Sequence, residues 1–248
     1  VNRYTPHTMP HIPLVVSDKL YTKDPKQAYI RTIEELDDSI GQVLKTLKET
    51  GVDDNTLVVF TSDNGPWHLK LRHHGGSALP LRGAKFSTWE GGMRVPTIMR
   101  WPGKIPAGSV CSEVAAACDL LPTFAKLAKA ELPKRKIDGK NIWRLMSGLE
   151  GAKSPHKAFY FYRGTVLRAV RSGEWKLHIG GGGRKQKQDD KKPALSLYNL
   201  SKDIGETTDV AAENEKIVQR MYKRAQTCDT ALKADARPPG EVKSGAEG

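Results

Sequence analysis

Asp63 and Asn64 are side chains whose position suggests chemistry, because they follow closely on an apolar run from Leu57 to Phe60. That run has no alternation of polar and apolar residues, which predicts a strand buried on both faces. In open α/β sheets, ligands bind at the carboxyl ends of strands, where the loops diverge. Two adjacent oxygen side chains at such a place could hold a hard cation. The alternative is that Asn64-Gly65 only turns the chain.

Two further residues, His11 and Lys85, could act on an anionic substrate. His11 lies between Pro10 and Pro13, and a restricted backbone suits a histidine that is positioned as an acid or base. Lys85 follows two small residues, which would let an anion approach its ammonium group closely. Taken separately, each of these side chains could also be a solvated surface residue.

A long helix is expected to precede the first strand. Between Pro25 and Thr50, apolar residues recur every three or four positions, which predicts an amphipathic helix with its apolar stripe packed on a sheet. Gly51 supplies the stop. The residues of the stripe are Ile30, Ile33, Leu36, Ile40, Val43, Leu44 and Leu47.

A second strand is predicted from Val95 to Trp101, with Pro96 near its start or on an edge. Together with the strand from Leu57 to Thr61, it should belong to a mixed or parallel sheet. The segment between them is rich in glycine and proline, and long loops of this kind in compact domains are usually functional. The first part of the chain therefore predicts an α/β domain.

The pattern changes beyond Pro155 to short alternating strands, followed by a helix. Strands are predicted at 159–162, 166–171, 174–179 and 195–200, with a hairpin at Ser172-Gly173 between the second and third. A helix from Asp209 to Ala234 should cover this small sheet, and residues 180–192 read as a polar surface loop. The expected inner face of the helix comprises Val210, Ile217, Val218, Met221, Tyr222 and Ala225.

Composition limits the classes of partner. The 248 residues carry a formal net charge of +12, which favours an anionic partner. The basic residues are spread along the chain without a nucleic-acid-binding motif, so we expect no nucleic acid. No apolar run approaches the roughly 18 residues of a membrane span. The three cysteines, Cys111, Cys118 and Cys228, show no CxxC spacing and indicate neither a disulfide framework nor a zinc site.

Five segments carry a resemblance to a known family: His11-Ile12-Pro13, LDDSIG at 36–41, TLVVFTSDNG at 56–65, PLRGAKFSTWEGGMRVP at 80–96 and RWPGKIPAG at 100–108. In order and spacing they resemble the type I sulfatases of the arylsulfatase kind, in the alkaline-phosphatase-like superfamily. Weaker similarity through 119–128, 136–148, 173–179 and 195–206 extends the resemblance over nearly the whole chain.

The resemblance implies an α/β fold: part of an alkaline-phosphatase-like sheet flanked by helices, plus a small C-terminal antiparallel sheet with a helix. Residues 1–154 would be the C-terminal part of the sulfatase catalytic α/β domain. Residues 155–236 would form a small C-terminal α+β subdomain, and 237–248 a disordered tail.

The resemblance also assigns roles to the residues singled out above. Asp63 and Asn64 match ligands of a divalent cation, usually Ca²⁺, with Mg²⁺ as the other candidate. Lys85 matches the lysine that contacts the sulfate ester. His11 matches the histidine near the leaving-group oxygen, and we expect both Lys85 and His11 to be catalytic and to bind substrate.

Three more residues lie in the loop expected to wall the pocket. Arg82 and His74, together with the adjacent His73, would either select the substrate or be exposed. The expected substrate is a sulfated small molecule or a sulfated glycan, and the resemblance implies an exported protein.

One departure from the family pattern concerns the nucleophile. The family converts a cysteine or serine in a C/S-x-P-S/A-R segment to formylglycine, and this sequence has no such segment. Cys111 and Cys118 lack the proline and arginine of that pattern. We therefore expect the formylglycine in missing N-terminal sequence and an inactive chain by itself. The alternatives are a short non-catalytic protein that binds polyanions, or a related phosphoesterase of the same superfamily.

Overall fold

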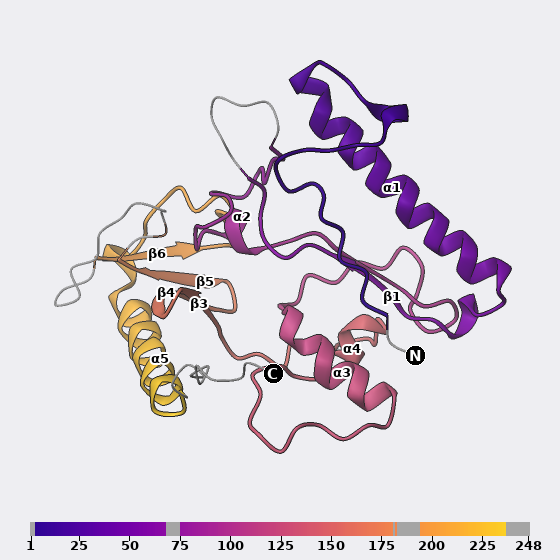
Figure 1. The fold of residues 1–248 in the computed structure, drawn as a ribbon. Helices are drawn as coiled ribbons and strands as arrows, with labels where there is room; N and C mark the ends of the chain where they lie inside the picture. The colour runs from indigo at the N-terminus through magenta and orange to yellow at the C-terminus, as the bar shows by residue number, and fades with distance from the viewer. Residues whose placement is uncertain (1–2, 68–74, 181, 183–193, 237–248) are drawn as a thin grey trace, which may run out of the picture. The chain divides into compact units, whose positions relative to one another are not determined.

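The computed structural model describes residues 3–67, 75–180, 182 and 194–236 (Figure 1). The chain divides into two compact units, Val1–Lys157 and Ala158–Gly248. The sequence placed this boundary three residues earlier, before Pro155. Most of the polar loop expected at 180–192, and the whole tail expected at 237–248, lie outside the described residues.

The long helix α1 spans Pro25–Glu49, as predicted (Figure 1). Asp24 caps its start by accepting a hydrogen bond from the Lys26 backbone N–H at 2.9 Å, and Pro25 occupies the first turn. Gly51, with a φ of +70°, ends the helix in a conformation that favours glycine. Two 3₁₀ turns, η1 at Asp18–Leu20 and η2 at Asp53–Asn55, lie before and after it.

The prediction that the apolar stripe of α1 packs on the sheet is wrong for part of the stripe. Ile30, Ile33 and Val43 are 48%, 38% and 45% exposed, whereas the one buried residue of the helix is Thr32. The helix has 25 residues, roughly 37 Å at 1.5 Å per residue. Strands β1 and β2 have four residues each, about 13 Å at ~3.3 Å per residue. The described two-stranded sheet is therefore too short to cover the helix.

Strands β1, Val58–Thr61, and β2, Thr97–Arg100, pair antiparallel with Val58 opposite Arg100. The parallel arrangement predicted for them is wrong, and a mixed sheet would need a strand beyond the two that pair within the described residues. An ion pair explains the register: the Arg100 guanidinium donates two hydrogen bonds of 2.7 Å to the Asp53 carboxylate, just upstream of β1. The end of β2 is thereby held beside the start of β1.

The burial predicted for the first strand is also wrong. Val58, Val59 and Phe60 are half-buried and Thr61 is exposed. A strand needs covering layers on both faces to be fully buried, and among the described residues β1 pairs with β2 alone.

In the rest of the first unit, the described residues form three short helices: α2 at Glu90–Met93, α3 at Leu120–Leu127 and α4 at Trp143–Met146, with the 3₁₀ turn η3 at Ala117–Asp119. The fully buried Asp119 carboxylate organises this region. It accepts hydrogen bonds from the backbone N–H groups of Ala116 and Lys140 and from His156 Nε2, all at 2.8–2.9 Å. Three segments distant in sequence are joined at one carboxylate.

The second unit confirms the small C-terminal sheet. Strands β3 (Phe159–Arg163), β4 (Val166–Ser172), β5 (Trp175–Ile179) and β6 (Leu195–Asn199) form an antiparallel sheet in chain order (Figure 1). Gly173, with a φ of +61°, makes the predicted hairpin between β4 and β5. A bulge at Phe161/Tyr162 interrupts the pairing of β3 with β4.

Helix α5, Glu215–Ala234, packs against this sheet as predicted. Met221 and Ala225 join Leu177 and Leu197 in the core, and the other four predicted inner residues pack around them. The helix begins six residues later than predicted, after a 3₁₀ turn, η4 at Ala212–Asn214. The reason lies at Asp209, whose side chain accepts a hydrogen bond from the Leu197 N–H at 2.9 Å and so ties this segment to β6.

None of the helices in the described part of the chain is both long enough and apolar enough to cross a bilayer.

Candidate active site

Two segments far apart in sequence are joined by backbone hydrogen bonds at the end of β1. The Gly65 N–H donates to the Gly92 carbonyl at 3.0 Å, and the Lys85 N–H donates to the Pro66 carbonyl at 2.9 Å. Since Gly65 and Pro66 follow Asp63-Asn64 directly, the predicted cation ligands and the predicted anion-binding lysine lie on adjoining segments.

Gly65 permits this close approach. A Cβ atom at this position would lie 1.9 Å from the Gly91 carbonyl oxygen, far inside van der Waals contact. Asn64-Gly65 is not the turn of a hairpin, because β1 pairs with a strand that begins only at Thr97. The glycine is required for packing against the segment that contains α2.

Asp63 is exposed and Asn64 is half-buried. Their carboxylate and amide oxygens are suited to a hard cation such as Ca²⁺, which takes about six to eight oxygen ligands. Within the described residues, no group of three or more His, Cys, Asp or Glu side chains is arranged to hold a metal ion. The donor chemistry therefore fits a divalent cation, and this pair would supply a minority of its ligands.

Lys85 lies at the second position of a tight turn. The Ser87 N–H donates to the Ala84 carbonyl at 3.0 Å, and Phe86, at the third position, has a φ of +73°. The Lys85 Nζ atom lies 5.5 Å from the Phe86 ring centroid and 6.0 Å from that of Trp67. Both distances are within the range of a cation–π interaction.

Arg82 is exposed and stacks on a buried neighbour. Its guanidinium carbon lies 3.8 Å from the ring centroid of Trp89, while its carbonyl accepts a hydrogen bond from the Gly91 N–H at 2.8 Å. The stack holds the guanidinium against the face of the Trp89 ring.

His11 is exposed, and its Nδ1 donates a hydrogen bond of 2.7 Å to the Ile12 carbonyl. Because a carbonyl can only accept, Nδ1 carries the proton in the neutral ring and Nε2 is left to exchange one. Among the described residues, no hydrogen bond joins His11 to the Asp63 or Lys85 segments. His74 and His73 lie outside the described residues.

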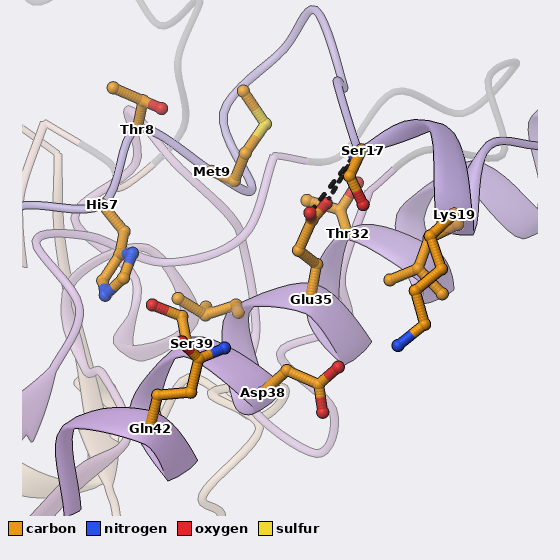
Figure 2. A pocket seen from close by; sticks show the side chains of 12 residues that line it. His7, Thr8, Met9, Ser17, Lys19, Thr32, Glu35, Asp38, Ser39 and Gln42 are labelled. Carbon is orange, nitrogen blue, oxygen red and sulfur yellow. Dashed lines mark hydrogen bonds between the residues drawn. The ribbon is translucent and has the colours of Figure 1, made fainter. Parts of the chain in front are cut away.

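A cavity of about 430 Å³ lies between the N-terminal loop and α1 (Figure 2). His7, Thr8 and Met9 line one side and residues of α1 the other, and the Ser17 N–H donates to both oxygens of Glu35 at 2.9 and 3.2 Å. Of the predicted site residues that the structure describes, none lines it. The cavity is therefore separate from the candidate active site.

Comparison with known proteins gives this arrangement a family. Residues 5–130 match the Sulfatase family profile, and residues 84–230 match the profile described as N-sulphoglucosamine sulphohydrolase, C-terminal. The chain belongs to the sulfatase family. The family fold, with its alkaline-phosphatase-like sheet and small C-terminal sheet, is the one predicted from the motifs.

Named relatives agree with this assignment. The sulfatase chain is 35% identical to human (Homo sapiens) arylsulfatase A over 82% of its own length and 43% of the relative, and 43% identical to rat (Rattus norvegicus) steryl-sulfatase over 61% and 26%. The solved structure of Ps i-CgsB in complex with k-i-k-neocarrahexaose matches with a TM-score of 0.73 at 28% identity, over 93% of this chain and 53% of that one. The chain thus spans about half, or less, of the length of these proteins.

The sequence motifs alone do not identify the aromatic residues around Lys85. No periodic pattern connects Trp67 with Phe86, which lie 19 residues apart. A usable signal was the adjacency of an aromatic residue to each of the two motifs that carry Asp63 and Lys85.

Proposed function

We propose that this sulfatase chain contributes to the hydrolysis of a sulfate ester, with its cation ligands and its ester-binding lysine on the two joined segments. The observation that supports this most directly is the hydrogen-bonded junction of Gly65-Pro66 with Lys85 and Gly92. It links the loop of Asp63 and Asn64 to the turn of Lys85 through backbone hydrogen bonds, and groups that act on one ester must be held in a fixed relation.

Asp63 and Asn64 would hold part of the shell of a Ca²⁺ or Mg²⁺ ion. Such a cation would polarise a sulfate oxygen when bound. Lys85 would bind another oxygen of the ester, since an ammonium group is a compact charge suited to a tetrahedral anion.

His11 would act on the leaving group. With Nδ1–H held by the Ile12 carbonyl, the ring in its imidazolium form would donate its Nε2 proton to the departing oxygen and be left neutral, which lowers the barrier to S–O cleavage. Arg82, oriented by Trp89, would bind a second polar group of the substrate.

The nucleophile would be a formylglycine outside this sequence, because no C/S-x-P-S/A-R segment occurs in it. Without it the covalent route is closed, and water would have to attack directly. We therefore propose that the 248-residue chain by itself does not turn over sulfate esters.

For the substrate we propose a sulfated glycan ahead of a small aryl sulfate. The net charge of +12 attracts polyanions, and a solved relative holds an oligosaccharide. Export of the protein stays a prediction from the family resemblance.

The test is turnover of an aryl sulfate and of a sulfated oligosaccharide, with added calcium. It compares the 248-residue chain with a longer form that carries a C/S-x-P-S/A-R segment ahead of Val1. We expect turnover only by the longer form, and Lys85→Ala and His11→Ala should each lower its kcat by at least about 100-fold. Full activity of the Lys85→Ala and His11→Ala variants would refute the assigned roles.

A further inference from the structure

Phe86 occupies a backbone position that favours glycine. It is the third residue of the turn Ala84–Ser87, and its φ of +73° places it in the left-handed region. A turn of this kind needs a positive φ at that position, where glycine is unstrained and a bulky residue is an outlier. The backbone there is strained.

The surroundings hold the strained turn in place. The Ser87 hydroxyl, in a buried residue, donates to the Ala84 carbonyl at 2.7 Å and accepts from the Ala84 N–H at 3.2 Å. Gly83 packs so closely that an added Cβ atom would lie 2.5 Å from the Ser87 hydroxyl oxygen. The turn is therefore well determined without the Phe86 side chain.

Core packing does not explain the phenylalanine either. Its side chain is 49% exposed, so glycine or a polar residue would be the expected choice for this turn. Strained positions of this kind cluster at functional sites, where the side chain has another role.

The Phe86 ring is used to flank the Lys85 ammonium. Nζ lies 5.5 Å from the Phe86 centroid and 6.0 Å from the Trp67 centroid. The two rings meet edge to face, with centroids 5.7 Å apart at an interplanar angle of 79°. Trp67 comes from the loop after Asp63-Asn64, so the contact also spans the two joined segments.

An aromatic ring beside Lys85 leaves the N–H donors of the ammonium group available, whereas a carboxylate would occupy them. Within the described part of the chain, Lys85 forms no ion pair with a carboxylate. A carboxylate beside Lys85 would compete with an anionic ester for the N–H donors of the ammonium group. The face of an aromatic ring attracts the ammonium through its quadrupole, and because the ring is neutral the positive charge of Lys85 is not neutralised.

We propose that Phe86 and Trp67 are positioning residues that hold the Lys85 ammonium toward the sulfate group of the substrate. This inference rests on the proposed role of Lys85 in binding the ester. Phe86 acts through Lys85 and does not itself touch the reacting atoms.

The first test is spectroscopic and does not depend on activity. In the 248-residue chain labelled with ¹³C-lysine, the Lys85 CεH₂ signal, assigned by its loss in Lys85→Arg, should be shifted upfield by the ring currents. Phe86→Leu should move it toward the other lysine signals, and Phe86→Tyr should keep it shifted. An unchanged Lys85 signal in Phe86→Leu would overturn the proposal.

The second test uses turnover by the longer form described above. Phe86→Leu and Phe86→Gly should each lower kcat/KM by roughly tenfold, the size expected for loss of a cation–π contact, whereas Phe86→Tyr should keep kcat/KM near that of the unmodified protein. Phe86→Gly relieves the strain, so it should fold at least as stably as the unmodified protein while being slower. Phe159→Leu, a ring removed elsewhere, is the control and should retain activity.

The two proposals fail in different ways. Full activity of Phe86→Gly together with loss of activity in Lys85→Ala would refute the positioning role and leave the ester-binding role intact. Full activity of Lys85→Ala would refute the ester-binding role, whatever the Lys85 signal shows.

Discussion

At the scale of single residues, the ion pair between Asp53 and Arg100 makes part of the stability depend on pH. The two hydrogen bonds from Arg100 lower the pKa of the Asp53 carboxyl. Because the folded-state pKa lies below the unfolded value of roughly 3.9, the pair stabilises the fold fully above that pH. The contribution is lost as the pH falls through the folded pKa.

We therefore expect Asp53→Asn to be less stable than the unmodified chain at pH 7, and the difference to shrink as the pH falls below roughly 3.9, the unfolded-state pKa of the carboxyl. Urea midpoints measured over a pH series would check this. Asp37→Asn, which alters an exposed carboxylate on α1, is the matched control and should leave the pH profile nearly unchanged. A constant difference between Asp53→Asn and the unmodified chain at every pH would contradict the assignment.

A second prediction at this scale concerns Gly65. In Gly65→Ala the new Cβ atom would collide with the Gly91 carbonyl, which is backbone and cannot move aside cheaply. We expect a loss of about 3 kcal/mol in the free energy of unfolding, or a displaced loop. Gly41→Ala is the control: it lies in α1 with no atom within 4 Å of the added Cβ, so it should stabilise by up to ~1 kcal/mol. Equal effects of the two substitutions would argue against the close approach.

At the scale of elements, the two helices with apolar stripes differ in what they bury. Helix α5 packs Met221 and Ala225 into the core with Leu177 and Leu197. Helix α1 leaves part of its stripe exposed, with Ile33 at 38%. The same periodicity therefore has different energetic value in the two helices.

Alanine substitutions should show this difference. Leu197→Ala removes a fully buried side chain and should cost roughly 2–5 kcal/mol, from lost transfer energy and the remaining cavity. Ile33→Ala removes a partly exposed side chain in a helix, where alanine has the higher propensity, and should cost less than about 1 kcal/mol. Thermal or urea unfolding of the 248-residue chain would measure both. If Ile33→Ala lowered the free energy of unfolding as much as Leu197→Ala, the Ile33 face of α1 would have to be buried in solution.

At the scale of the whole molecule, two properties should respond to different substitutions: binding of polyanions, which depends on the net charge of +12, and turnover, which depends on the candidate site. Binding of a sulfated polysaccharide should weaken steeply as salt is raised, because it depends on many cations at once. Lys85→Ala removes one of 40 basic residues and should leave this binding nearly unchanged, while it abolishes turnover by the longer form. Titration of the polysaccharide at several salt concentrations, beside the turnover assay, would test this. Loss of polysaccharide binding in Lys85→Ala, with turnover retained, would place Lys85 in a polyanion-binding surface and not in the enzyme site.

The sequence by itself determined the local elements and the family. Helix α1 with its Gly51 stop, the β4–β5 hairpin at Gly173 and the inner face of α5 follow from periodicity and turn chemistry, which depend on residues near one another in the chain. The motifs around Asp63 and Lys85 likewise sufficed to indicate a sulfatase, which the family comparison confirms.

Only the tertiary structure decided the long-range pairings. The antiparallel register of β1 with β2 is held by Arg100 and Asp53, which are 47 residues apart, and the late start of α5 results from a bond between Asp209 and β6. The flanking of Lys85 by Trp67 likewise depends on two segments meeting in space. No local pattern encodes these contacts, because each depends on which distant residue the folded chain brings within a few ångströms.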